Sequence, residues 1–361
     1  MVSGRLIGFR NPVEGRSEDL GRMFLLGAIY AALGALTFSL NNVAMRRGVV
    51  TGSVLQAMAL TVPIGGLSFL AMAAGVGELP QVFVFPAVSL AWLVGQGVVH
   101  FVLGRYCNYK SNQLMGVNLS GPVVQLQVPV AMLLAVATLH ERFTVLQAIG
   151  SALMLGGSFT TQRNSEKPSG KEPGKNEPGK KLPGKPGFAP SVISGYGFGF
   201  GAALCYGSSP LMAREAFLHA PGASTLAGGC IAYGAATLFF ALIVLKPGSW
   251  RDITSMKREN LPWFLASAVL VAVSQAFVYA SLAMAPLMVV TPILQLALVF
   301  RLFLSRWINP DQEVTNLAVY LGAATAVVGS ILVSLDTDDL TALLDLPEGA
   351  GGFLRYRLAG Y

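Results

Sequence analysis

Long apolar runs alternate with short polar segments along the chain, a pattern typical of a helical protein that crosses a membrane several times. Most runs reach about 18 residues or more, enough for an α-helix to cross the hydrocarbon core of a bilayer. The first begins after a polar N-terminus and continues as one long span, which predicts a retained helix and no cleaved signal peptide. The pattern predicts ten transmembrane helices, at 23–45, 53–75, 87–107, 112–138, 145–160, 191–213, 222–245, 261–281, 285–306 and 314–335.

Composition supports the membrane class. Hydrophobic residues make up 53% of the 361 residues, and charged residues only 12%, whereas about 25% is usual in soluble domains. The net charge is +7, but many basic residues lie in one segment and no aromatic residues are interleaved with them. We therefore expect no nucleic-acid partner.

That basic segment divides the apolar part of the chain. Residues 161–190 repeat the triplet PGK without apolar periodicity, which predicts a disordered linker; a contact with anionic lipid is the alternative. The predicted organisation is listed here by residue range: an N-terminal tail at 1–22, a first five-helix repeat at 23–160, the linker at 161–190, a second five-helix repeat at 191–335 and a C-terminal tail at 336–361.

The two halves carry matching residues in the same order, about 170 residues apart. The clearest pair is PVVQLQ at 122–127 and PILQLA at 292–297, each with a proline followed by a glutamine inside an apolar run. Five helices is an odd number, so the second half would enter the membrane inverted. Inverted repeats are common in secondary transporters, with the substrate site near the midplane between the halves. Other matched pairs are Gly34/Gly201, Met45/Met212, Tyr109/Tyr279, Gly150/Gly322 and Ser158/Ser330.

The stretch LHERFTVLQAIGSALMLGG at 139–157 resembles the junction after the fourth helix in EamA-type members of the drug/metabolite transporter superfamily. The resemblance covers most of both halves. It implies a ten-helix permease of the plasma membrane, commonly an exporter, with a central cavity shared by two five-helix repeats. The second junction, NPDQEVT, matches less well, because Asp311 and Glu313 compete for the acidic position.

Polar side chains inside a membrane are costly and are therefore candidates for function. His100 lies near the centre of the third predicted span, as the only ionisable side chain expected at that depth, and Gln96 lies one helical turn before it on the same face. Two interpretations stay open: a cavity wall where His100 binds solute or relays a proton, or a neutral histidine bonded to a neighbouring helix.

Other polar residues in the spans are candidates for the same cavity, with interhelical hydrogen bonding as the alternative role. They are Asn41, Asn42, Asn118, Gln125, Tyr206, Gln275, Thr291 and Gln295.

The charges restrict the class of solute. No acidic residue falls at the centre of a predicted span, which disfavours lipophilic cations and favours neutral, zwitterionic or carboxylate-bearing metabolites. Basic residues near the predicted span ends are candidates for attracting anionic groups towards the cavity mouths. They are Arg47, Arg105, Lys110 and Arg214, although Arg47 and Arg214 also fit a snorkelling role.

The sequence thus predicts a transporter of a small polar metabolite such as an amino acid, working by alternating access. The glycine-rich GYGFGFG at 195–201 lacks nucleotide-loop spacing, and no metal-ligand pattern is present, so we expect no cofactor and no metal. An integral membrane enzyme or a receptor is the rival interpretation. Family resemblance implies cytoplasmic termini, whereas the distribution of Lys and Arg favours external termini; both orientations and the oligomeric state stay open.

Overall fold

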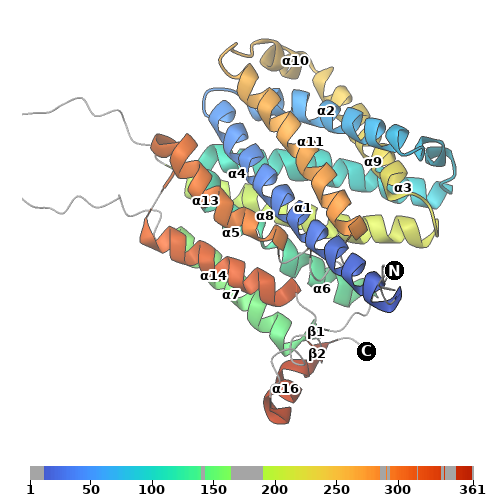
Figure 1. The fold of residues 1–361 in the computed structure, drawn as a ribbon. Helices are drawn as coiled ribbons and strands as arrows, with labels where there is room; N and C mark the ends of the chain where they lie inside the picture. Colours follow the sequence, from blue (N-terminus) through green and yellow to red (C-terminus); the bar gives the residue numbers. More distant parts are fainter. Residues whose placement is uncertain are drawn as a thin grey trace, which may run out of the picture.

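The computed structural model describes residues 12–139, 143–163, 190–284, 290, 293–314, 316–334, 337 and 347–359. These residues form a helical bundle with one short β-pairing (Figure 1). In the first half the elements are α1 (Pro12–Val49), α2 (Val54–Gly75), η1 (Leu79–Phe83), α3 (Ala87–Gly97), η2 (Val98–Gly104), α4 (Arg105–Met115), α5 (Val117–Val124), α6 (Gln127–Leu139), β1 (Phe143–Thr144) and α7 (Val145–Arg163). In the second half they are α8 (Val192–Leu218), α9 (Thr225–Val244), α10 (Pro247–Thr254), α11 (Leu261–Met284), α13 (Leu296–Ile308), η3 (Pro310–Gln312), α14 (Leu317–Ser334), α16 (Glu348–Arg355) and β2 (Arg357–Ala359).

Six helices in the described part of the chain are long and apolar enough to cross a membrane. They are Leu25–Val49, Val54–Gly75, Ala87–Met115, Val117–Thr138, Thr225–Val244 and Leu261–Val278. Each agrees with a predicted span to within several residues. The fifth and tenth predicted spans correspond to shorter apolar helices in α7 and α14, the sixth corresponds to α8, and the ninth lies only partly within the described residues.

The largest boundary error concerns the third and fourth spans. The third helical run continues from Ala87 to Met115, although the sequence placed its end at 107. Its last turns are polar, but Asn108, Ser111 and Asn112 are buried against other helices and so remain within the bundle. The run ends at Gly116, whose φ of 84° lies in the left-handed region that favours glycine.

The helix of the fourth span is interrupted at its proline and glutamine. Pro122 lies inside α5, and the helix ends at Gln125, with φ −65° and ψ −16°. Gln295 has nearly the same backbone angles, φ −67° and ψ −18°, where α13 begins. The backbone carbonyl of each glutamine accepts a hydrogen bond from the N–H three residues later. The donor is Val128 in one half (3.0 Å) and Leu298 in the other (3.1 Å).

Helices pack across the two halves. α1 lies along α11, and α7 lies beside α14 at one edge of the bundle (Figure 1). The last pair approaches closely because glycines face each other: a Cβ on Gly150 would lie 2.7 Å from the carbonyl oxygen of Gly329. Small residues at such contacts are the usual means by which membrane helices approach.

Two ends of the chain differ from the predicted tails. α1 begins at Pro12, well before the expected start at residue 23. At the other end, where a simple tail was expected, α16 is followed by β2, which pairs antiparallel with β1. The Val145 backbone N–H donates to the Tyr356 carbonyl at 3.0 Å, so the C-terminal segment is held against the start of α7.

Candidate substrate cavity

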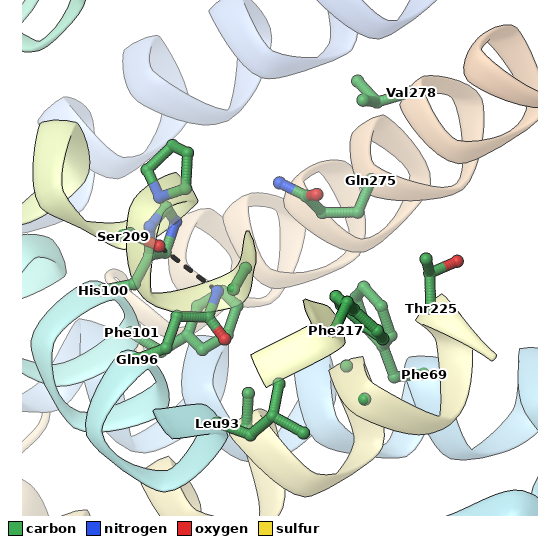
Figure 2. A pocket seen from close by; sticks show the side chains of 15 residues that line it. Phe69, Leu93, Gln96, His100, Phe101, Ser209, Phe217, Thr225, Gln275 and Val278 are labelled. Carbon is green, nitrogen blue, oxygen red and sulfur yellow. Dashed lines mark hydrogen bonds between the residues drawn. The ribbon is translucent and has the colours of Figure 1, made fainter. Parts of the chain in front are cut away.

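A cavity of about 670 Å³ lies among α2, α3 with η2, α8, α9 and α11. Most of its polar groups gather at one end, where Gln96 donates through Nε2 to the Ser209 hydroxyl at 3.2 Å. Gln275 reaches from α11 towards this pair and His100 (Figure 2). Apolar walls follow at the other end, built by Phe69, Leu93 and Phe217. Thr225 lies near Phe217 at this end (Figure 2), so the cavity has one end rich in hydrogen-bonding groups and one mainly apolar end.

A second space of about 140 Å³ adjoins the first, because His100 and Gln275 line both. This small compartment is the more polar of the two. Its remaining polar lining consists of Asn41, Arg105, Asn108, Tyr109, Gln127 and Tyr206. Side chains from α1, α4, α6, α8 and α11 thus meet in one interior space.

His100 lies in η2, a π-helical segment. Such segments are rare and occur frequently at functional sites. The ring centroid of His100 lies 4.7 Å from that of Tyr206, and its buried Nδ1 atom has no hydrogen-bond partner among the described residues. Nδ1 therefore makes no bond to a neighbouring helix among the described residues, and the role of His100 as a solute-binding or proton-relaying group stays a prediction.

Arg105 corrects two expectations. It is not at a span end but within the third helical run, five residues after His100, so His100 is not the only ionisable group at that depth. Its guanidinium donates to the Thr61 carbonyl and to the Tyr233 hydroxyl, both at 2.9 Å. The Phe101 ring lies 5.5 Å from its central carbon. The sequence signal for this buried arginine was its position between an apolar run and a polar stretch of helix.

The π-helical segment places Arg105 on the same face as His100. In an α-helix, residues five apart differ by roughly 140° around the axis. In η2 the backbone N–H of Arg105 bonds to the carbonyl of His100, which is an i→i+5 pattern that stacks the two residues. His100 and Arg105 therefore face the same compartment.

The predicted asparagine pair divides between two roles. Asn41 lines the small compartment, and its Oδ1 accepts from the Ser267 hydroxyl at 2.6 Å. Asn42 is fully buried; its amide donates to the Phe38 carbonyl at 2.8 Å, and its Oδ1 accepts from Asn112 at 3.3 Å. Asn42 therefore belongs to a hydrogen-bond network between helices and lines neither space.

The structure brings the two repeat glutamines together. Gln125 donates through Nε2 to Oε1 of Gln295, and Gln127, which lines the small compartment, donates to Gln125 at 3.2 Å. Gln125 and Gln295 thus lie behind the compartment wall and line neither space. Asn118 also lies elsewhere, accepting from the Ser305 hydroxyl at 2.6 Å. Thr291 lies outside the described residues.

A buried ionic cluster lies beyond the small compartment, and sequence analysis missed its importance. Glu313, between η3 and α14, accepts from the backbone N–H groups of Val117 at 2.9 Å and Asn118 at 3.0 Å, at the N-terminus of α5. Arg46 lies 3.5 Å from its carboxylate. Burial raises the pKa of Glu313, and Arg46 together with the two N–H groups opposes that rise. Glu313 is thus the buried acid of the NPDQEVT junction, whereas Asp311 is exposed.

Arg46 ties several elements together. Its guanidinium donates to the carbonyls of Asn112 and Gln113, both at 2.7 Å, and of Gln312 at 2.9 Å. Nearby, the Asn309 amide donates to the Val43 carbonyl at 2.9 Å. The C-terminal end of α1 is thereby bonded to α4 and to the segment between α13 and α14.

Comparison with known proteins agrees with this architecture. Residues 25–162 match the EamA-like transporter family. The resemblance is confirmed for this segment. That family is one of membrane transporters, and the described part of the chain holds six helices long and apolar enough to cross a membrane, as a multi-pass membrane protein requires. It is consistent with a chain that is not an enzyme.

The fold has solved counterparts. Sixteen chains of solved structures match. One of them, titled "Crystal structure of protein", shares 18% sequence identity with a TM-score of 0.55, over 90% of this chain and 99% of the other. At that identity the likeness concerns the fold alone. The comparison with curated proteins gives no match.

Proposed function

We propose that the chain is a secondary transporter that exports a small polar metabolite, such as an amino acid, across the plasma membrane. The observation that carries the proposal is an interior space lined by both halves of the chain. The first half contributes Gln96 and His100, and the second half contributes Ser209 and Gln275. Substrate sites between the repeats of a transporter have this position. A concave space with an apolar wall and a few convergent polar groups is the usual form of a small-molecule site.

Two inverted five-helix repeats, at 23–160 and 191–335, would produce this arrangement. In support, the helix breaks at Gln125 and Gln295 have nearly equal backbone angles. Cross-half packing is also reciprocal: α1 of the first half packs on α11, and α8 of the second half packs on α3, η2 and α4. Ten spans related in this way place both termini on one side of the membrane, with 161–190 as the linker and 336–361 as the C-terminal region.

Alternating access would then open and close the two ends of the interior space in turn. Phe38 and Asn41 of α1 line the small compartment, and Arg46 lies about 7 Å further along the helix. The bonds of Arg46 and Glu313 connect the halves at this level. We propose that this cluster closes one end while the 670 Å³ cavity leads to the other.

Metabolites released by cells test the transport function. Cells would express the native chain, a His100→Leu/Gln275→Leu variant or an empty vector, at matched membrane abundance. We expect one or more small metabolites to accumulate in the medium with the native chain only, because the double variant removes the polar groups common to both spaces. A Leu103→Ala/Leu265→Ala variant is the matched control, since these side chains are 47% and 39% exposed on the same helices.

Equal release by all cells, together with equal uptake of the same metabolites, would contradict the transport function. A compound that appears only in chemically altered form would instead indicate an enzyme. Release that survives the double variant would keep the transporter but remove His100 and Gln275 from its path.

A further inference from the structure

We infer that Arg105 binds the carboxylate group of the transported solute, so that the cargo is a small carboxylic acid with an apolar body. The inference rests on the proposed function and narrows its substrate class. It also assigns the group that recognises the solute, which neither the family match nor the apolar pattern does.

The position of Arg105 provides the first argument. Its side chain is buried, at 5% exposure, yet it lines the small compartment together with His100 and Gln275. Within the described part of the chain no carboxylate pairs with it. Its bonds go to a carbonyl and a phenol, those of Thr61 and Tyr233, and to aromatic faces. The guanidinium therefore keeps a full positive charge without a counter-charge.

Such a charge is costly inside a membrane protein. Charged side chains at membrane depth almost always pair with a partner or line a functional path, and a buried ion without a partner is strongly destabilising. The chain does supply a carboxylate where a buried arginine is structural, because Arg46 lies beside Glu313. Arg105 instead faces an open compartment, which is the arrangement expected if the counter-charge arrives with the solute.

The compartment has the chemistry to complete a carboxylate site. Guanidinium groups bind carboxylates with two parallel hydrogen bonds. Amide donors of Asn41 and Gln275 and the hydroxyl of Tyr206 line the same space. A volume of about 140 Å³ suits a polar head group, and the π-helical turn of η2 aligns this head-group site with His100.

The rest of the solute would extend past His100 and Gln275 into the larger cavity. There Phe69, Leu93 and Phe217 provide apolar surface. Among the described residues, no Lys, Arg, Asp or Glu side chain lines this larger space, and its polar residues Gln96, Ser209 and Thr225 carry no charge. The larger space therefore favours an apolar body over a second charged group.

Acid–amide pairs of one shape test the inference with the purified full-length protein. The probes are phenylacetate with phenylacetamide and isovalerate with isovaleramide, and the measurement is the dissociation constant from titration calorimetry. The native protein is expected to bind at least one acid about tenfold or more tightly than its amide, since a charge-assisted bond is lost in the amide. Arg105→Gln should lower acid affinity to that of the amide, whereas Arg105→Lys should retain part of the preference.

Controls separate binding from folding. Arg47→Gln removes an exposed arginine on α1 and should leave the preference unchanged. If Arg105→Gln does not fold, Tyr233→Phe keeps the arginine but removes one of its anchors, and it should weaken the acid more than the amide. Equal binding, or no binding, of acid and amide by the native protein would overturn the inference, as would an acid preference that survives in Arg105→Gln.

The same probes distinguish this inference from the transport function. Acid binding that needs Arg105 but gives no flux in proteoliposomes would uphold the carboxylate site and refute transport of these acids. Flux of acid and amide at equal rates, unchanged in Arg105→Gln, would uphold transport and refute the carboxylate site.

Discussion

A Glu313→Ala variant is expected to lose about 3–5 kcal/mol of stability, the usual cost of leaving one partner of a buried ion pair alone. Glu313 is 8% exposed, and its carboxylate accepts from two backbone N–H groups of α5 as well as facing Arg46. Without it, Arg46 loses the carboxylate beside it, and the start of α5 loses two acceptors. The measurement is the temperature at which the purified protein loses its monodisperse chromatographic peak.

Asp311→Ala is the matched control for this variant. Asp311 belongs to the same connection but is exposed, so its removal should change stability by less than about 0.5 kcal/mol. Equal stability of the two variants would show that Glu313 does not hold this end of the bundle together, and the proposed closure by the Arg46–Glu313 cluster would have to be abandoned.

An Ala213→Trp variant is expected to reduce solute flux at least about tenfold while leaving membrane abundance unchanged. Ala213 of α8 lines the 670 Å³ cavity beside Ser209 and Phe217, and an indole there would occupy much of the space where a solute binds. Vacant space allows the larger side chain to enter with less strain than a packed core would impose. Initial rates of flux of the metabolite identified in the release experiment provide the measurement.

Leu204→Trp provides the comparison, since Leu204 lies on the same helix and is 46% exposed on its outer side. This variant should transport at the native rate. If Ala213→Trp transported as well as Leu204→Trp, the cavity would not be the path of the solute.

Much of the architecture follows from hydrophobicity alone. Apolar runs predict the positions of α1, α2, α9 and α11 because a helix must satisfy its backbone groups within itself to cross lipid. The matched prolines, each followed by a glutamine, predict an interrupted helix in both halves. The side chains of Gln125 and Gln295 are hydrogen-bonded to each other. Their role as cavity lining was less predictable, because periodicity gives the face of a helix but not what the neighbouring helix places against that face.

Two features depend on tertiary structure in ways that periodicity cannot express. The π-helical turn in η2 changes which residues share a face, and so brings Arg105 beside His100. Glu313 looks like an ordinary loop acid in the sequence. Its burial arises only because α1 brings Arg46, and Gly116 allows the start of α5, to the same point.

Cysteine labelling distinguishes an interior that opens to both sides of the membrane in turn from one that opens to a single side. A single cysteine at Ala213, in a chain whose Cys107, Cys205 and Cys230 are replaced by serine or alanine, would be exposed to a membrane-impermeant maleimide in right-side-out and in inside-out vesicles. With alternating access we expect labelling from both sides, with the ratio of the two rates shifted by the transported solute. Labelling from one side only, at a rate that the solute does not change, would contradict it.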